Sequence, residues 1–358
     1  MRIAVLGVGL IGGSIGLAAR QRLDDVEVVG FGRDEGRLDR ARALGALDHV
    51  TTDLRDALAG AQVCFACAPV GVLPELVHQT LAAAPADCVV TDVGSTKRRI
   101  VEAVGDERFV GGHPIAGAET AGVDNARADL FQGATWYLTP GERSSGLLYE
   151  RLYRLVVEMG ARPIAIDAET HDRLLATVSH LPHVIANVLV AQAARTLDEQ
   201  GEALPRVGPS FRDATRVAGA NSEVWTDIYL ANADAIADEA EELARRLGVV
   251  AESLRSGDPE ALRTWNEDAR EDRRRLLEAD LAGGPVHELH VPVPNRPGVV
   301  ARLAVALGRA GVNIVDMALA PAPDMRTGAI TLWVAGDEAA TRAREVVDAL
   351  DFGEEDAG

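Results

Sequence analysis

A histidine and a glutamate lie in a glycine-framed stretch of the chain, from Gly111 to Glu119. The stretch follows a short apolar run, Phe109-Val110, of the kind that forms a buried strand. Strand ends in α/β proteins are where catalytic and binding side chains gather, so His113 and Glu119 are candidate functional groups. A His-Pro pair in a loop is also common as a plain turn with a solvated histidine, and the surrounding elements must decide between the two interpretations.

Two further polar segments follow apolar runs, at 68–71 and at 92–97. The second contains Lys97, the only lysine among the 36 basic residues of the chain. Because the chain uses arginine almost exclusively, Lys97 either has a functional ammonium group or is present by chance. Ser95 is predicted at a helix N-cap, where a hydroxyl group accepts a hydrogen bond from a backbone N–H.

Two pairs of polar residues stand out further along the chain. His180 and His183 are spaced to share one face of a helix, which Pro182 is expected to bend. No third ligand stands at a fitting spacing, so we predict no metal site and expect both histidines to face a polar cleft. Arg212 and Arg216 lie one helical turn apart and could hold carboxylates through charge-assisted hydrogen bonds. Ion pairs with acidic surface residues are the alternative role of these arginines.

The amino-terminal segment has the order strand, G-x-G-x-x-G, helix. In a dinucleotide-binding domain the first glycine permits a tight turn, the second lets the backbone approach a pyrophosphate, and the third allows the helix to pack closely on the strand. The amides at the helix N-terminus then bind the anion. The predicted cofactor-binding residues of this turn are Gly7, Gly9, Leu10, Ile11 and Gly12.

The choice of nicotinamide cofactor depends on the end of the second strand. An acidic residue that binds the ribose is expected about 20 residues after the last motif glycine. That position is Gly32, and Arg33 follows it. A missing carboxylate and an adjacent arginine favour a 2′-phosphate, so we predict NADP, with NAD left open because Asp34 is one residue further on.

Three domains are expected from the order of the elements. Alternating strands and helices to residue 167 predict an α/β Rossmann domain at 1–167, and long helical periodicity predicts an all-α substrate-binding and dimerisation domain at 168–283. A βαββα pattern predicts a small α+β, ferredoxin-like domain at 284–358. Predicted strands are 2–6, 27–31, 63–68, 88–92, 134–140, 162–166, 287–293, 311–317 and 329–334, and predicted helices include 35–44, 73–83, 146–159, 299–310 and 338–350.

The composition restricts the partners and the compartment. The 36 basic and 55 acidic residues give a net charge of −19, which would repel nucleic acid and anionic membranes. The three cysteines form no disulfide framework, and Cys64 and Cys67 lie in an apolar run typical of a buried strand. No run has the roughly 18 continuous apolar residues of a membrane span. We therefore expect a cytoplasmic protein without an anchor.

Six segments together resemble the prephenate/arogenate dehydrogenase family of tyrosine biosynthesis. They follow the order of the family over about two thirds of the chain, and the match is specific. A shorter pattern, Asn295–Gly298 with Gly311–Ile314, resembles ACT regulatory domains. The six segments are Gly7–Ser14, Asp92–Lys97, Gly112–Gly117, Leu130–Ala134, Ser179–His183 and Phe211–Arg216.

The resemblance implies an oxidative decarboxylation. In that reaction a hydride leaves C4 of a cyclohexadienol for the nicotinamide while the ring carboxylate departs as CO2. By resemblance, His113 is the neutral imidazole that accepts a hydrogen bond from the 4-hydroxyl, and Ser95 orients the hydroxyl and the nicotinamide. Ala118 stands where some members have threonine, so prephenate and arogenate, a dianionic and a zwitterionic substrate, both stay open.

Other roles also follow from the resemblance. Arg216 is implied to bind a substrate carboxylate, His183 and His180 to line the same pocket, and Glu119 to act as a gating acid. Trp225 matches a tryptophan near the substrate, although it is interpreted first as a core residue. The ACT-like segment implies a tyrosine effector, bound by Asn295, Gly311 and Asn313, in a domain that lacks its last strand because the chain ends in an acidic tail.

Two alternative functions remain open on these residues. A β-hydroxyacid dehydrogenase of related architecture would use a lysine on its helical domain, and no lysine follows Lys97. A non-catalytic NADPH and amino-acid sensor would bind both ligands without turnover. Long amphipathic helices outside the Rossmann domain need a partner surface, so a homodimer is expected in either case.

Overall fold

The computed structural model describes residues 1–117, 120–200, 207–279, 286–322 and 326–350. Two compact units make up the chain. One comprises Met1–His171 together with Gly284–Gly358, and the other comprises Asp172–Gly283. Because the carboxy-terminal segment groups with the amino-terminal one, the first unit contains both sheets of the structure.

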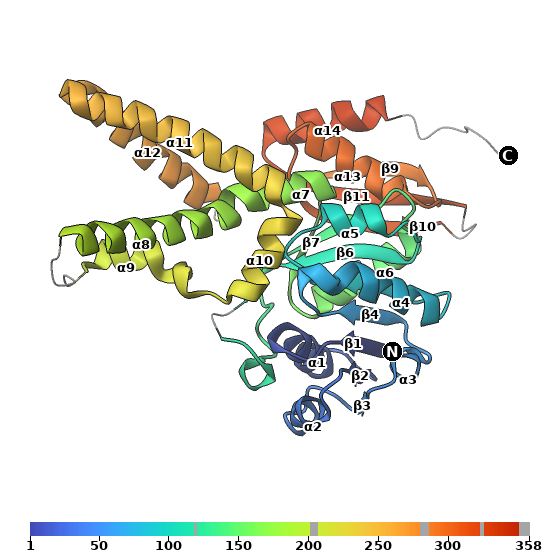
Figure 1. The fold of residues 1–358 in the computed structure, drawn as a ribbon. Coiled ribbons are helices and arrows are strands. Elements are labelled where there is room, and N and C mark those ends of the chain that lie inside the picture. Colours follow the sequence, from blue (N-terminus) through green and yellow to red (C-terminus); the bar gives the residue numbers. More distant parts are fainter. Residues whose placement is uncertain (118–119, 201–206, 280–285, 323–325, 351–358) are drawn as a thin grey trace. The chain divides into compact units, whose positions relative to one another are not determined.

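The large sheet of the first unit has eight strands in the order β3-β2-β1-β4-β5-β6-β7-β8 (Figure 1). The first six strands are parallel to one another, whereas β7 runs antiparallel to β6 and parallel to β8. The predicted α/β Rossmann architecture is confirmed, but the sequence pattern did not predict β3 or the reversed direction of β7. The strands are β1 (Arg2–Leu6), β2 (Glu27–Phe31), β3 (His49–Thr51), β4 (Val63–Ala66), β5 (Val89–Asp92), β6 (Phe109–Pro114), β7 (Thr135–Pro140) and β8 (Arg162–Ala165).

Both faces of this sheet are covered, as alternation along β1 shows. Ile3 and Val5 belong to one apolar cluster, and Ala4 and Leu6 belong to another. Successive side chains of a strand point to opposite faces, so an apolar residue at every position requires helices on both sides. The helices are α1 (Leu10–Arg22), α2 (Glu35–Ala43), α3 (Leu54–Leu58), α4 (Leu73–Ala83), α5 (Arg98–Ala103) and α6 (Gly146–Glu158).

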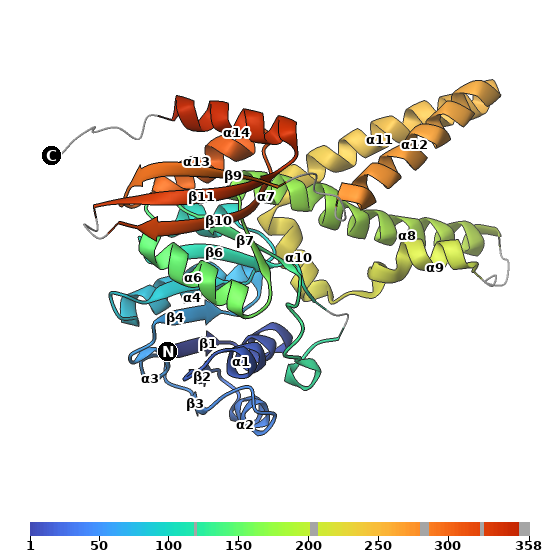
Figure 2. The same cartoon turned by 180° about the vertical axis from the view of Figure 1, so that it is seen from behind.

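A second, three-stranded sheet belongs to the carboxy-terminal module, which we define as residues 286–350. Its antiparallel strands lie in the order β10-β11-β9, and α13 and α14 lie together on one side of it (Figures 1 and 2). The predicted βαββα order of elements is therefore observed. The elements are β9 (Val286–Pro294), α13 (Val299–Arg309), β10 (Ile314–Pro321), β11 (Thr327–Ala335) and α14 (Asp337–Ala349).

The edge strand β10 is covered by helix α6 of the Rossmann domain. The backbone N–H of Leu319 donates to Glu150 Oε2 at 2.9 Å, and that of Met317 donates to the Tyr153 hydroxyl at 3.2 Å. These bonds satisfy donors that an open sheet edge would leave exposed. The side chains of Glu150 and Tyr153 are both buried, and their hydrogen bonds attach the carboxy-terminal module to the Rossmann domain.

All described elements of the second unit are helical. A π-helical turn, Ala176–His180, connects α7 (Ala168–Leu175), which begins in the first unit, to α8. The sequence predicts a bend at Pro182. In the structure the helix type changes just before this residue, from α to π and back to α, and the helical path is not broken. The other elements are α8 (Leu181–Gln200), α9 (Pro209–Thr215), the 3-10 turn η4 (Arg216–Gly219), α10 (Ser222–Ala231), α11 (Ala233–Ser256) and α12 (Pro259–Ala279).

One helical run in the described residues, Ala168–Arg195, is long and apolar enough to span a membrane by length and composition alone. This is weak evidence for a span, because core helices of soluble proteins pass the same test. Exposed apolar side chains continue on the other helices of this unit, at Leu247 and Leu254 of α11 and Trp265 of α12. Such a distribution is typical of helices that bury a face against a partner.

Candidate active site

The glycine-rich turn after β1 has the backbone geometry that its sequence predicts. Gly7 has a φ of +97°, and a Cβ atom there would lie 2.2 Å from the carbonyl oxygen of Cys67. A Cβ atom on Gly12 would lie 2.2 Å from the oxygen of Gly7, whereas one on Gly9 would meet nothing within 4 Å. Helix α1 begins at Leu10, directly after that open position. The turn therefore presents backbone amides of a helix N-terminus to open space, as a pyrophosphate site requires.

The end of β2 places two charged residues differently. Asp34 is the N-cap of α2: its Oδ1 accepts from the backbone N–H of Arg37 at 3.1 Å, and its Oδ2 lies 3.3 Å from the Arg37 guanidinium. Arg33 is exposed beside it. The Asp34 carboxylate therefore already has a structural role as a helix cap.

His113 lies in strand β6, which corrects the prediction of a loop. The strand continues through the glycines because both sit in crowded positions. A Cβ atom on Gly111 would lie 2.2 Å from Thr139 Oγ1, and one on Gly112 would lie 2.6 Å from the Asp92 carbonyl oxygen. The glycines thus permit close packing of neighbouring strands rather than a turn. His113 pairs in register with Tyr137 of β7 and is only 8% exposed.

A second histidine contacts His113 that the sequence patterns did not single out. His171 of α7 is fully buried, and its Nε2 lies 2.9 Å from His113 Nδ1. The edge of the Tyr137 ring also meets His171, with ring centroids 5.5 Å apart at 85°. The sequence analysis missed His171 because this residue lies in an ordinary helical pattern. No glycine, proline or second histidine stands close enough to it in sequence to indicate a functional site.

Asp92 and Lys97 form a fully buried ion pair beneath the end of β5. Asp92 Oδ2 also accepts from the backbone N–H of Gly94 at 2.8 Å, and Asp92 Oδ1 accepts from that of Gly112 at 3.1 Å. One carboxylate therefore joins the loop that carries Ser95 to the strand that carries His113. The predicted cap is wrong: α5 begins at Arg98, with Lys97 at the N-cap position, so Ser95 does not cap it.

In the helical unit, two predicted residues form an aromatic cluster. His183 stacks on Trp225 with ring centroids 3.5 Å apart and planes within 5°, and its Nδ1 lies 2.5 Å from the Tyr229 hydroxyl. Burial lowers the pKa of His183, an effect that the backbone carbonyl of Val217 partly opposes. Trp225 is only partly buried, so the interpretation of it as a core residue is wrong. The cluster therefore combines a buried imidazole, whose pKa is lowered, with two partly buried aromatic rings.

His180 and Arg216 lie beside this cluster. The His180 ring meets Trp225 edge-on with ring centroids 6.1 Å apart, and Asn232 bridges His180 Nδ1, at 3.2 Å, to the carbonyl oxygen of Asp172, at 2.7 Å. Arg216 is exposed and starts η4, which packs against α8, the helix of His183. Glu119, the predicted gating acid, lies outside the described residues together with Ala118.

The predicted effector residues are not brought together within one module. Asn295 follows β9, whose last residue, Pro294, pairs with Thr327 of β11. Gly311 and Asn313 precede Ile314 of β10, which pairs with Val334 near the other end of β11. The register therefore separates these groups by almost the length of the sheet.

The turn beside Asn295 makes a different contact. Gly298, at a φ of +83°, donates its N–H to the Ser144 carbonyl oxygen at 2.9 Å. A Cβ atom at that glycine would lie 2.1 Å from the oxygen of Glu142. The turn is therefore docked against the Rossmann domain.

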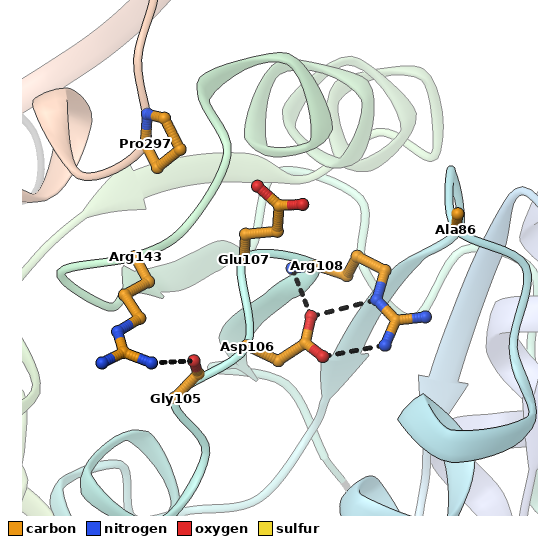
Figure 3. Close-up of a pocket in the computed structure, with 7 residues that line it drawn as sticks. All are labelled: Ala86, Gly105, Asp106, Glu107, Arg108, Arg143 and Pro297. Carbon is orange, nitrogen blue, oxygen red and sulfur yellow. Dashed lines mark hydrogen bonds and ion pairs between the residues drawn. The ribbon is translucent and has the colours of Figure 1, made fainter. Parts of the chain in front are cut away.

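A surface pocket of about 700 Å³ is lined by residues 105–108 and by side chains near them (Figure 3). Those residues directly precede β6, whereas His113 lies near the other end of that strand. Arg108 in the pocket is held by both carboxylate oxygens of Asp106, at 3.0 and 2.8 Å, and this pair lowers the pKa of Asp106. Arg143 donates to the carbonyl oxygen of Gly105 at 3.3 Å. Asp106, Arg108 and Arg143 are thus engaged with the protein itself. The residues that line the pocket are Ala86, Gly105, Asp106, Glu107, Arg108, Arg143 and Pro297.

Within the described ranges, no group of three or more His, Cys, Asp or Glu side chains could hold a metal ion.

The parallel strands of the large sheet and the open glycine turn after β1 define a dinucleotide-binding domain. Residues 15–165 match the family model for the nucleotide-binding domain of prephenate dehydrogenase, and residues 167–267 match the model for its dimerization domain. The chain belongs to the prephenate dehydrogenase family.

Individual relatives agree with this assignment. A cyclohexadienyl dehydrogenase of Zymomonas mobilis is 36% identical over 239 residues, 65% of this chain and 82% of that protein. A prephenate dehydrogenase of Bacillus subtilis is 28% identical over 97% of this chain and 95% of its own length. The crystal structure of prephenate dehydrogenase from A. aeolicus, in complex with hydroxyphenyl propionate and NAD+, is similar with a TM-score of 0.70 and 27% identity over 77% of this chain and 98% of that chain.

Proposed function

We propose that the chain catalyses the oxidative decarboxylation of prephenate or arogenate with a nicotinamide cofactor. One observation carries the proposal: the open glycine turn after β1, the loop of Ser95 after β5 and the buried His113 at the end of β6 all lie at the carboxyl edge of one parallel sheet. That edge is where doubly wound sheets bind their ligands. Membership of the prephenate dehydrogenase family supports the reaction type.

In the proposed mechanism, this chain supplies an acceptor for the proton of the substrate hydroxyl. A nicotinamide held by the glycine turn after β1 would supply the hydride acceptor for C4, and loss of the ring carboxylate as CO2 would make the ring aromatic. His113 accepts the hydrogen bond of the 4-hydroxyl as that carbon gains carbonyl character, which requires a neutral imidazole. The burial of His113 excludes water from this hydrogen bond. Ser95 orients the hydroxyl and the nicotinamide ring.

The substrate carboxylates are assigned to the helical unit. Arg216 is the proposed carboxylate-binding group, and His183, His180 and Trp225 are proposed to contribute to substrate binding. The stacked arrangement of His183 on Trp225, with its lowered histidine pKa, supports an uncharged contact surface. Glu119 is kept as the proposed gating acid. The choice between the dianionic prephenate and the zwitterionic arogenate stays open.

NADP is the proposed cofactor, with NAD as the alternative. The support is local: Gly32 carries no carboxylate, Arg33 is exposed, and Asp34 is engaged as the cap of α2. A guanidinium group in that position would pair with a 2′-phosphate. The solved relative from A. aeolicus binds NAD+, so a direct comparison of the two cofactors is needed.

The carboxy-terminal module is proposed as an ACT-like regulatory domain that binds tyrosine. Its βαββα order supports this role, and the Bacillus subtilis relative extends over the same part of the chain. Because Asn295 lies far from Gly311 and Asn313 within one module, a site that used all three residues would need a second copy of the chain.

A cytoplasmic homodimer is the proposed state of the protein. The exposed apolar residues of the helical unit, such as Val178, Val188 and Leu254, would be buried between two copies. The match to a dimerization domain supports this use of the helices. The run Ala168–Arg195 is accordingly assigned to an interface rather than to a membrane, and the net charge of −19 argues against nucleic-acid partners.

The function is tested by mixing the purified full-length chain with prephenate or arogenate and with NAD or NADP. We expect the ultraviolet absorbance of the reduced nicotinamide to rise in step with CO2 release, faster with NADP than with NAD. Cofactor binding without reduction on either substrate would contradict the proposed enzyme and favour a sensor. Reduction with simple β-hydroxy acids, but not with these two substrates, would favour a β-hydroxyacid dehydrogenase.

A further inference from the structure

The buried pair of His113 and His171 is an arrangement that the proposed reaction has not yet explained. The two side chains come from different elements, β6 and α7, and both are almost completely buried. The Nδ1 of His113 and the Nε2 of His171 are 2.9 Å apart, with the rings edge to face at 67°. Two imidazoles at this distance must share a proton, because two lone pairs facing each other would repel.

The position of His171 is fixed from two sides. At the start of α7, the Asp167 carboxylate accepts from the Thr170 N–H at 2.9 Å, and the His171 N–H donates to the Asp167 carbonyl oxygen at the same distance. On the other side, its ring meets Tyr137, the register partner of His113 on β7. The helix start thus holds the backbone of His171, while burial and the contact with Tyr137 restrict rotation of its ring away from His113.

The direction of the shared hydrogen bond determines what His113 can do. If His113 carries its proton on Nδ1 and donates it to His171, then His113 Nε2 has a lone pair and can accept a hydrogen bond. If His171 donates instead, the proton of His113 lies on Nε2, which becomes a donor. Only the first arrangement suits an acceptor for a substrate hydroxyl group.

We propose that His171 is a positioning residue that accepts the Nδ1–H of His113 and thereby selects the tautomer with its lone pair on Nε2. This inference rests on the proposed function of His113. A carboxylate in the place of His171 would stabilise the imidazolium form strongly, whereas a neutral imidazole orients His113 without adding a charge. When the substrate hydroxyl gives up its proton, that proton goes to His113 Nε2, and His171 keeps its hydrogen bond to Nδ1–H.

The kinetic test compares two substitutions of His171. A glutamine can place its amide oxygen near the position of Nε2 and accept the same hydrogen bond, whereas a leucine cannot. We expect His171→Leu to lower kcat by about 10- to 100-fold with little change in KM, as is typical when an orienting partner is lost. His171→Gln should recover most of this loss. The exposed His290 provides a control, since His290→Leu should leave both constants unchanged.

Equal losses in the glutamine and leucine variants, or a wild-type kcat in His171→Leu, would overturn the inference. Thermal unfolding of each variant identifies a leucine variant that fails to fold. In that case the glutamine variant carries the test together with the spectroscopic measurement below, which needs no turnover.

The tautomer itself is measured by long-range proton–nitrogen NMR of the histidine side chains in the full-length chain. The His113 signals are assigned by their disappearance in His113→Asn. We expect His113 protonated on Nδ1 in the wild type and a loss of this preference in His171→Leu. Protonation of His113 on Nε2 would overturn the role of His171, whatever the substrate proves to be. Nδ1 protonation in a chain that turns over neither prephenate nor arogenate would instead contradict the proposed function alone.

Discussion

The two units hold their candidate residues in different ways. In the first unit, His113 is buried, bonded to His171 and carried on a strand whose backbone is tied to the Asp92–Lys97 pair. In the helical unit, Arg216 is exposed at the start of a 3-10 turn, whereas His183 is buried between its stacking partner Trp225 and the Tyr229 hydroxyl. The fixed geometry around His113 suits the chemical step, and the exposed guanidinium of Arg216 suits capture of a charged substrate. Substitutions in the first unit should therefore lower kcat, and those in the helical unit should raise KM.

The largest effect is expected at His113. His113→Asn removes the proposed acceptor, and general-base contributions of this kind amount to about 10²- to 10⁴-fold. We expect kcat to fall by that factor with little change in KM, measured from initial rates of nicotinamide reduction. Turnover at the wild-type rate would show that His113 takes no part in the reaction. It would also contradict the assignment of the chemical step to the first unit.

The buried ion pair should dominate stability in the first unit. Asp92→Asn leaves the ammonium group of Lys97 without its carboxylate, and breaking a buried pair costs about 3–5 kcal/mol. Urea unfolding should show this loss, and the double variant Asp92→Asn with Lys97→Met should recover part of it. A free energy of unfolding within about 1 kcal/mol of the wild type for the single variant would show that the pair does not hold the strand ends together.

Arg216 tests the other half of the contrast. A charge-assisted hydrogen bond contributes about 1.5–3 kcal/mol, so Arg216→Leu should raise KM by about 10- to 150-fold with a smaller change in kcat. Arg212, also exposed and one helical turn earlier, is the matched control, and Arg212→Leu should leave KM unchanged. Equal effects of the two substitutions would point to general charge attraction rather than to a carboxylate site at Arg216.

Two glycine turns of the first unit give a smaller contrast. Gly298→Ala would strain a left-handed backbone and press Cβ against the Glu142 oxygen, so we expect a loss of about 1–3 kcal/mol in the free energy of unfolding. Gly9→Ala, at an open position with a φ of −105°, should leave stability unchanged and weaken binding of the nicotinamide cofactor. Fluorescence titration with the reduced cofactor checks the second expectation. Unchanged affinity would argue that the turn does not hold the pyrophosphate.

The smallest effect is the pH dependence at His183. Burial lowers its pKa in the folded chain below the ordinary value of 6.5, so the unfolded chain takes up a proton first as the pH falls. The resulting loss of stability starts as the pH falls through 6.5 and is complete below the folded pKa. Urea unfolding of the wild type and His183→Gln should diverge in that range. Parallel pH profiles would contradict a buried, neutral His183.

The sequence predicted the elements that depend on local signals. The glycine motif, the apolar strands and the βαββα order of the carboxy-terminal module are all written in short segments, and their bounds agree within a few residues. His113 was misplaced in a loop because glycines signal turns as well as crowded strands, and only the approach of Asp92 and Thr139 distinguishes the two.

Long-range contacts were the part that no pattern could reveal. His171 lies 58 residues from His113 in the chain, and nothing near it in sequence indicates the pairing. Ser95 was assigned to a cap because a serine before a helix usually caps it, yet α5 starts three residues later. Trp225 was interpreted first as a core residue, although it is partly exposed and stacks on His183. Each error arose where tertiary packing outweighed a local preference.

A crystal structure of the chain with the oxidised cofactor and a hydroxyphenyl product analogue would test the central claim most directly. The account predicts the phenolic oxygen within hydrogen-bonding distance of His113 Nε2, with His113 Nδ1 on His171. A ligand bound with its phenolic oxygen on another group, and with His113 Nε2 turned away from it, would contradict the account.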